Sequence, residues 1–333
     1  MAYIRELFGA TYISGIPEPT YHLRPELGAL PAGTTHTRAS SGTYWDATMT
    51  LQTASTNVPR FTYWPGVAGG PFLLREQAAT NLFLNSATGA TQSITVSAVV
   101  YTLSFLGTGT ITLSGVSTAG PLVGTGTNNL VSLTFTPTAG SLTCTVSGSC
   151  TNVQLETGTG ATSRVVTGGS SATRALDVIT LPSACVSFPS SSFMLRVAPI
   201  ISTTGNGWGL YLGQALSESV VSSYNAPSGS TLRVMQYASS SAVVSQLSNT
   251  PGLLNLSTQV VAWGGGSTIT SYNGVTPVTT TAASPAPGSP IYMLGGNNGS
   301  GNAGFTVLIQ TLRLWKGFKL NAGQAQQLSA FTG

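Results

Sequence analysis

The stretch that decides the fold runs from residue 260 to residue 328. It contains four segments: VVAWGGGSTITSYNGVTPVT (260–279), IYMLGGNNGS (291–300), FTVLIQTLRLWKGFKL (305–320) and NAGQAQQL (321–328). Residues 260–263 and 268–272 predict two strands, the second closed by Asn273-Gly274. This dipeptide favours a two-residue hairpin turn, because both of its positions need a positive φ. Residues 291–294 predict a third strand, which ends in a loop rich in glycine and asparagine.

The segment 305–315 alternates so that two sets of side chains point in opposite directions. Both sets are largely apolar, which predicts a strand that is buried on both faces, as between packed sheets. One set is Phe305, Val307, Ile309, Thr311, Arg313 and Trp315, and the other is Thr306, Leu308, Gln310, Leu312 and Leu314.

A short helix is predicted after this strand. Asn321 is placed to cap its N-terminus, and Gln324 three residues later can reach back to the Asn321 N–H in a capping box. Ala325 and Leu328 then face inward at helical spacing.

These motifs resemble the concanavalin A-like (laminin G-type) jelly rolls. Members of that group often have a "YNG" hairpin, a late strand of the "LRLWKG" kind and a terminal "QAQQL" turn of helix, which match 272–274, 312–317 and 324–328. The resemblance implies a jelly-roll domain over residues 178–333.

Composition supports an all-β protein. The chain has 333 residues, which predicts two or three domains, and only 6% of them are charged, against the usual quarter. Gly (40) and Pro (18) recur between alternating segments, and hydrophobic residues at 41% are enough to build cores. The predicted architecture is therefore two β-sandwich (jelly-roll) domains in series, after an N-terminal arm and a connector.

Several function classes are disfavoured. The net charge of +4 is spread along the chain without a basic run, which argues against nucleic-acid binding. No apolar stretch reaches membrane-spanning length, so we expect no membrane insertion. The N-terminus lacks the layout of a signal peptide, so export would need lysis or a specialised route.

Cysteine and histidine are too few for metal or redox chemistry. Cys144 and Cys150 could face each other across a hairpin, but the odd count of three cysteines favours reduced, packed thiols. No CxxC pair exists, and the two histidines, His22 and His36, do not complete a zinc site. We expect no metal and no cofactor.

Residues 1–43 show no clear period and are punctuated by four prolines, which predicts an extended arm. One interpretation is a loosely packed terminus. The other is an arm that docks on a neighbouring subunit through six apolar residues, since its apolar content is high for a solvated tail. The predicted assembly contacts are Tyr3, Ile4, Leu7, Phe8, Tyr12 and Ile13.

Residues 44–86 resemble a connector that is common in virion proteins of tailed bacteriophages. The shared pattern is an aromatic-Asp hairpin, then N-x-P-R-F-x-Y, a Gly/Pro turn and L-x-E-x-x-x-T-N-L-x-x-N-S. It matches at Tyr44, Asp46, Leu51, Asn57, Pro59, Arg60, Phe61, Tyr63, Leu74, Glu76, Thr80, Asn81, Leu82, Asn85 and Ser86. The chain departs from it mildly at 71–76. Arg60 and Glu76 are expected partners that hold the fold and have no catalytic role.

Residues 87–177 alternate strongly between short polar turns, which predicts a small β-sandwich. Its end carries Gln154-Leu155-Glu156, Ala161-Thr162-Ser163 and Thr173-Arg174-Ala175-x-Asp177. This end is similar to the closing segment of carbohydrate-binding-module-like jelly rolls in the same phage proteins. Residues 168–171 are the expected linker.

Catalysis is not expected. A glycosidase needs two carboxylates about the scissile bond, and residues 178–333 hold one acid, Glu218. The same scarcity disfavours a calcium site.

Sugar binding through aromatic platforms and amides remains open. The candidate glycan-binding residues are Trp208, Tyr272, Asn273, Asn297 and Asn298. Tyr272, beside the turn, is the ring most expected to be exposed, and the alternative for it is packing on its own hairpin. The loop 295–304 has the alternative of a plain solvated loop.

Two hypotheses follow. In the first, the chain is a virion structural protein of the fibre, decoration or tail-associated kind. It would be assembled in the host cytoplasm, attached to capsid, neck or tail proteins by its N-terminal region, and would form a homo-oligomer, with a trimer as the specific expectation. In the second, it is an adhesin that binds a host surface glycan. A concave aromatic patch would favour glycan binding, whereas inward aromatics and a flat Ser/Thr face would favour the structural role.

Overall fold

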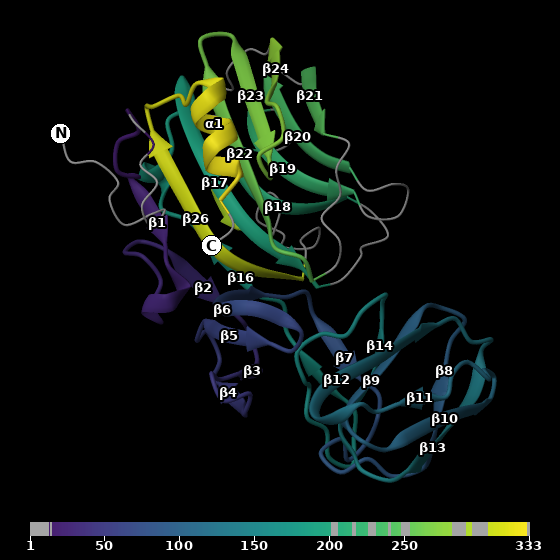
Figure 1. Cartoon of the computed structure of the whole chain (residues 1–333). Helices are drawn as coiled ribbons and strands as arrows, with labels where there is room; N and C mark the ends of the chain where they lie inside the picture. Colours follow the sequence, from purple (N-terminus) through teal and green to yellow (C-terminus); the bar gives the residue numbers. More distant parts are fainter. Residues whose placement is uncertain are drawn as a thin grey trace.

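The structure is a computed structural model that describes residues 13, 15–200, 206–214, 218–225, 231–238, 241–247, 254–281, 291–294 and 306–331. These residues form strands β1–β26, two short 3-10 helices, η1 (Pro25–Leu27) and η2 (Ser183–Cys185), and the helix α1 (Ala322–Ser329). The predicted all-β class is confirmed (Figure 1). In this part of the chain no helix has the length and apolar character that crossing a membrane requires.

The C-terminal half is a sandwich of two antiparallel sheets, as the sequence predicted (Figure 1). One sheet contains, in spatial order, β24 (Val278–Thr281), β23 (Ser267–Tyr272), β22 (Ser257–Gly264), β17 (Ser190–Pro199) and β26 (Val307–Lys316). The other contains β2 (Thr35–Thr37), β16 (Val178–Thr180), β25 (Ile291–Leu294), β18 (Asn206–Gln214), β19 (Glu218–Asn225), β20 (Thr231–Ala238) and β21 (Ser241–Leu247).

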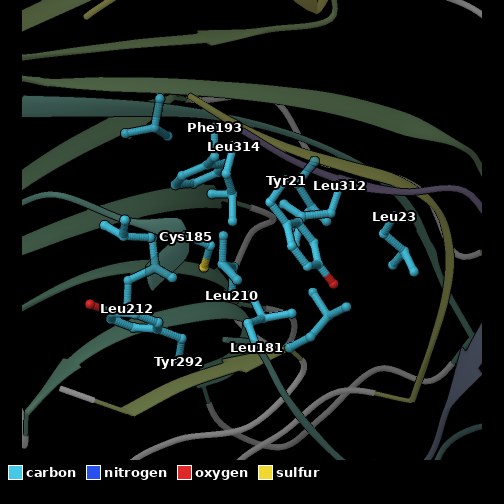
Figure 2. Close-up of a cluster of buried hydrophobic side chains, with 14 of the residues drawn as sticks. Tyr21, Leu23, Leu181, Cys185, Phe193, Leu210, Leu212, Tyr292, Leu312 and Leu314 are labelled. Atoms are coloured by element: carbon cyan, nitrogen blue, oxygen red, sulfur yellow. The ribbon is translucent and has the colours of Figure 1, made fainter. Parts of the chain in front are cut away.

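The main core lies between these two sheets. Phe193 and Leu312 come from the first sheet, and Leu210, Leu212 and Tyr292 come from the second, all in one buried cluster (Figure 2). Each of the five is at most 2% exposed. Burial of a large apolar side chain contributes roughly 1.5–3 kcal/mol, so this interface between sheets is the main source of stability for this half.

Strand β26 is buried on both faces, as its two apolar sets predicted. The strict alternation is wrong, however. Arg196 pairs with Thr311 and Val197 pairs with Ile309, so Gln310 is an extra residue in β26. This β-bulge reverses the phase, and Ile309 and Leu312 both reach the core between the sheets.

Helix α1 covers the outer face of the first sheet (Figure 1). Its predicted capping box is present: Gln324 N donates to Asn321 Oδ1, and Asn321 N donates to Gln324 Oε1. Ala325 and Leu328 are fully buried, as predicted, against a cluster that includes Trp315.

The two-residue hairpin lies elsewhere than predicted. Strands β22 and β23 pair up to Gly264 and Ser267, so Gly265 and Gly266 form the tight turn, both with positive φ. Asn273 and Gly274 do form a turn with φ of 44° and 77°, but strands β23 and β24 begin to pair only at 270 and 278. This turn therefore belongs to a longer connection.

The N-terminal segment is not an extended arm over residues 20–37. Strand β1 (Tyr21–Leu23) pairs with β26, and β2 pairs with β16. Ile13 is 8% exposed and packs in the cluster under α1, so its side chain contacts its own chain and not a neighbouring subunit as predicted. The physical reason is that the backbone groups of β1 and β2 pair with strands of their own chain, and Ile13 buries its side chain there.

The connector extends the large sheet beyond β26 through β6 (Val67–Arg75), β5 (Arg60–Trp64), β3 (Gly42–Trp45) and β4 (Leu51–Ala54). Its apolar cluster contains Trp45 and Phe72, together with Leu106 from the small sandwich and Leu308 from β26. All three parts of the protein thus meet in one cluster.

The small sandwich packs two sheets around its own core. One sheet has the order β11 (Leu122–Val123), β10 (Thr110–Gly115), β13 (Gly140–Ser147) and β8 (Gln92–Val96). The other has β12 (Gly126–Phe135), β9 (Tyr101–Gly107) and β14 (Cys150–Thr157). A two-stranded ribbon, β7 (Ala79–Asn81) with β15 (Ala172–Arg174), joins it to the connector. Cys144 and Cys150 are buried free thiols in different sheets.

Candidate functional site

Five charged residues of this charge-poor chain gather in the interior, where the connector meets both sandwiches. We call Arg38, Arg60, Glu76, Arg174 and Asp177, with His36, the junction cluster. Arg60 opens β5, Glu76 follows β6, Arg174 ends β15, and Asp177 precedes β16. Strand ends from separate parts of the chain thus place their charges at one point. Arg60, Glu76 and Asp177 have no exposed surface.

Asp177 is the most connected carboxylate of the cluster. Its Oδ1 accepts hydrogen bonds from His36 Nε2 at 2.9 Å and from Arg38 Nη1 at 3.0 Å. Its Oδ2 accepts from Glu76 N at 2.9 Å and from Arg60 Nη2. Both oxygens are therefore satisfied without water, which is the condition under which a buried charge is tolerated.

Glu76 links the connector to the small sandwich. Its Oε2 accepts from Arg60 Nη1 at 2.7 Å and lies 3.3 Å from Arg174 Nη1. Its Oε1 accepts from Ser163 N at 2.7 Å, and the Ser163 hydroxyl donates to Oε2. Because Ser163 follows the last strand of the small sandwich, one carboxylate holds two parts of the chain together.

Arg38 ties the cluster to the tip of the connector. Its Nη2 donates to the carbonyl oxygens of Ala54 and Ser55, and its Nη1 donates to that of Val58. These bonds hold the end of β4 and the turn that follows it, so this side chain fixes the local backbone.

The electrostatics follow from these contacts. Burial alone would raise the pKa of Asp177, but the charge of Arg60 and the hydrogen bond from His36 outweigh it and hold that pKa well below its usual range. Burial would also raise the pKa of Glu76, but the charges of the Arg174 and Arg60 guanidinium groups outweigh it and lower that pKa. Both carboxylates are therefore ionised at neutral pH.

A second buried polar group lies next to the cluster. We call Gln154, Glu156 and Thr162 the amide–hydroxyl site, and all three are at most 4% exposed. Thr162 Oγ1 donates to Glu156 Oε2 at 2.7 Å, and Gln154 Nε2 donates to Glu156 Oε1 at 2.6 Å. Gln154 Nε2 also lies 3.0 Å from Thr162 Oγ1. The site thus holds a hydroxyl, a carboxyl and a carboxamide in mutual contact.

The carboxyl of this site differs from those of the junction cluster. Burial raises the pKa of Glu156, and neither its hydrogen bonds nor the charge of Arg164 compensate. Burial likewise lowers the pKa of Arg164 to about 10. A carboxyl with a raised pKa is a stronger base than an exposed glutamate.

The predicted pairing of Arg60 with Glu76 is confirmed, and the expectation that it holds the fold agrees with its place. Sequence reasoning missed that the pair is not alone and that Asp177, Arg38 and His36 join it. The sequence did contain a signal. The chain has few charged residues, so those in the connector motif and in the closing motif of the small sandwich could have been predicted to pair with each other.

Of the five predicted glycan-binding residues, Tyr272 and Asn273 have described side chains. The expectation that Tyr272 is exposed is wrong: it is 3% exposed, and burial raises the pKa of its hydroxyl. Asn273 Oδ1 accepts from Thr258 N, and Gly274 O accepts from Gln326 Nε2 of α1, so the turn packs against the helix. The Trp208 side chain, Asn297 and Asn298 lie outside the described residues.

The remaining predictions have mixed outcomes. Tyr3, Ile4, Leu7, Phe8 and Tyr12 lie outside the described residues. Within the described ranges, no three histidine, cysteine or acidic side chains come together as a metal site. Every described aromatic side chain is buried or half-buried.

No protein-family model matches the chain, and no curated protein matches it. Solved structures give similarities in fold. One is the CBM40 of the Ruminococcus gnavus IT-sialidase bound to alpha2,3 sialyllactose (10% identity, TM-score 0.37, covering 43% of this chain and 84% of that chain). Another is domain 4 of AbnA, a GH43 extracellular arabinanase from Geobacillus stearothermophilus, in complex with arabinotriose (17%, 0.40, 66% and 87%). A third is domains LG4-5 of the mouse laminin alpha1 chain (12%, 0.30, 80% and 96%). At these identities the likeness concerns the β-sandwich fold alone.

Proposed function

We propose that the chain is a non-enzymatic structural protein of a tailed-bacteriophage particle, assembled in the host cytoplasm, in which the connector fixes two β-sandwiches relative to each other. The observation that carries the proposal is the identity of the clustered residues. Arg60 and Glu76 are matches to the virion connector pattern, and Arg174 and Asp177 belong to the closing motif of the sandwiches found in the same proteins. The residues that carry the resemblance to virion proteins are therefore the residues that join the connector to the two sandwiches.

The burial of the carboxylates supports a role without catalysis. Glu76, Glu156 and Asp177 are at most 1% exposed and are hydrogen-bonded on both oxygens. A substrate cannot reach them without unfolding the junction. They therefore do not supply the pair of carboxylates that glycoside hydrolysis requires.

The small sandwich presents an uncharged hydroxyl face, which also supports a structural role. Outward residues of β10 and β13 pair across the sheet, as in Thr112 with Thr145 and Ser114 with Thr143, and Thr143 pairs in turn with Ser93 of β8. The Ser93 and Thr143 hydroxyls lie 2.9 Å apart. An uncharged Ser/Thr face of this kind fits packing within an assembly better than capture of a soluble ligand.

The test is incorporation into particles. We would supply the phage that encodes the chain with a C-terminally tagged full-length copy and with a copy that lacks residues 1–12. Particles would then be purified on a density gradient. The full-length chain should sediment with the particles. The shortened chain should keep its fold, because β1 and β2 remain, but it should lose incorporation if these residues make the attachment. A full-length chain that stays at the top of the gradient would overturn the proposal.

Recognition of a host surface glycan is the second candidate. It rests on Trp208, Asn297 and Asn298, because the buried Tyr272 is withdrawn from it. A glycan array probed with the full chain and with its Trp208→Ala variant tests it. Specific binding that the variant loses would support an adhesin, and absence of binding to every glycan would leave the structural role alone.

A further inference from the structure

The amide–hydroxyl site has the parts of a self-modifying centre. A nucleophilic hydroxyl, Thr162 Oγ1, is hydrogen-bonded to a carboxylate oxygen, Glu156 Oε2, at 2.7 Å. The same oxygen of Thr162 lies 3.0 Å from Gln154 Nε2, which is bonded directly to the carboxamide carbon Cδ. The hydroxyl therefore contacts a general base and the amide nitrogen of the group that it would attack, which places the nucleophile, base and leaving group of a covalent reaction together.

The carboxamide is also held in one orientation. Gln154 Oε1 accepts a hydrogen bond from Val165 N at 2.7 Å, and Nε2 donates to Glu156 Oε1 at 2.6 Å. The contact with Val165 fixes which end of the amide is oxygen, because a backbone N–H can only donate. The Val165 N–H lies where negative charge would develop on the carbonyl oxygen during attack at Cδ.

We propose that Thr162 and Gln154 form an intramolecular ester bond in the folded protein. Thr162 Oγ1 attacks Gln154 Cδ and transfers its proton to Glu156 Oε2. The bond between Cδ and Nε2 then breaks, and Glu156 returns the proton to the departing nitrogen, which leaves as ammonia. The Oγ1–Cδ bond forms, one ammonia is lost, Glu156 is regenerated, and no oxidant, metal or other co-reactant is consumed.

The residues around the site favour the reaction, and they do so only when the chain is folded. Gln154 is fully buried, and Thr162 is 4% exposed, so competing water is excluded and the product ester is shielded from hydrolysis. Arg174 Nη1 lies 3.2 Å from Thr162 Oγ1, and its charge stabilises the oxygen as it loses its proton. Fixed placement of both groups substitutes for a high concentration of reactants, which in well-oriented systems reaches effective molarities of about 10⁵–10⁸ M.

The raised pKa of Glu156 agrees with this role. Burial raises it, so the carboxyl is a stronger base than an exposed glutamate and also a competent acid for the leaving nitrogen. Other contacts of the hydroxyl, such as Ser163 O at 3.3 Å, are longer than its bond to Glu156.

The cross-link would close the chain around Glu156, since Glu156 lies between Gln154 and Thr162. It would also secure Thr162 beside Ser163, which hydrogen-bonds Glu76 of the junction cluster. The ester therefore reinforces the place where the small sandwich is held, whatever the protein binds or builds.

The first measurement is the mass of the intact, denatured full chain. The expected result is a mass lower than the sequence mass by one ammonia. Thr162→Val, which keeps the shape but removes the hydroxyl, should have its full sequence mass, and so should Glu156→Gln. Thr162→Ser should again lack one ammonia, and the exposed control Thr112→Val should behave as the unaltered chain. Ammonia loss at the Asn273-Gly274 turn is distinguished by Asn273→Ala, which should keep the deficit.

The second measurement uses the position of Glu156. A protease that cuts after glutamate divides the denatured chain there, into 77–156 and 157–218. With the ester these two pieces stay joined, and mild alkali separates them and leaves glutamate at position 154. Pieces that separate without alkali, or a full sequence mass for natively folded protein, overturn the proposal. Neither result bears on particle incorporation, so the two proposals fail independently.

Discussion

Glu76 and Glu156 are two glutamates with almost no exposed surface, and they accept hydrogen bonds from neighbouring backbone groups. Glu76 accepts from Ser163 N, and Glu156 accepts from Thr162 N. The pKa of Glu76 is lowered, and the pKa of Glu156 is raised. Burial acts on both in the same direction, so burial does not explain the difference. The difference comes from the charges of Arg174 and Arg60, the second of which also hydrogen-bonds the Glu76 carboxylate, whereas Arg164 influences Glu156 only through its charge.

This comparison separates two uses of a buried carboxyl. Paired with guanidinium groups, it is a fixed anion that joins parts of the chain. Surrounded by an amide and a hydroxyl, it can exchange a proton and so take part in chemistry.

The largest expected effect is a loss of stability in acid that comes from the junction cluster. The folded-state pKa values of Glu76 and Asp177 lie below those of the unfolded chain, which are about 4. Their contribution is therefore fully present above about pH 4 and is lost as the pH falls through the folded values. Urea denaturation from pH 7 to pH 2 should show this loss, and a free energy of unfolding that stays constant below pH 4 would contradict it.

The next largest effect is expected for Asp177→Asn. It leaves Arg38 and Arg60 without their shared anion, and removal of one partner from a buried ion pair costs roughly 3–5 kcal/mol. Chemical denaturation at pH 7 measures it. The matched control is Glu26→Gln, which breaks the exposed ion pair with Arg24 and should change the stability by less than about 1 kcal/mol. Equal effects for the two variants would show that the junction cluster is not a coupled unit.

The smallest effect is expected for Glu156→Gln, compared in a Thr162→Val background where no ester can form. No guanidinium hydrogen bond to Glu156 is broken, and the amide can still accept from Thr162 N, so the change at pH 7 should be about 1 kcal/mol or less. The contribution of the Glu156 carboxyl to the free energy of unfolding changes with pH in the opposite direction to that of Asp177. Because the pKa of Glu156 is raised, its stabilisation is present below about pH 4 and is lost as the pH rises. A loss as large as that of Asp177→Asn would contradict the comparison.

The candidate site could be predicted only in part. The connector pattern identified Arg60 and Glu76 as partners, and their pairing is confirmed. The remaining members come from positions far apart in the chain: His36 and Asp177 are separated by 141 residues. No local pattern relates such residues, because their meeting depends on how β2 and β16 pair.

Tyr272 shows a second reason for failure. A tyrosine beside an Asn-Gly turn is expected at the surface, and the turn itself is present. Its burial follows from the packing of the two sheets, because its side chain belongs to the core cluster between them. Helix α1 packs only on the turn, where Ser329 Oγ accepts from Gly274 N. The sequence near the turn carries no information about what packs over it.

The sequence by itself determined the all-β class, the strands within 260–315 and the capping box of α1, because these depend on alternation and on contacts within a few residues. Only the tertiary structure decided the bulge at Gln310, the folding of β1 onto β26 and the gathering of the charges. The physical reason is range. Backbone preferences act between neighbours in the chain, whereas burial and charge pairing act between whichever groups the packed sheets bring together.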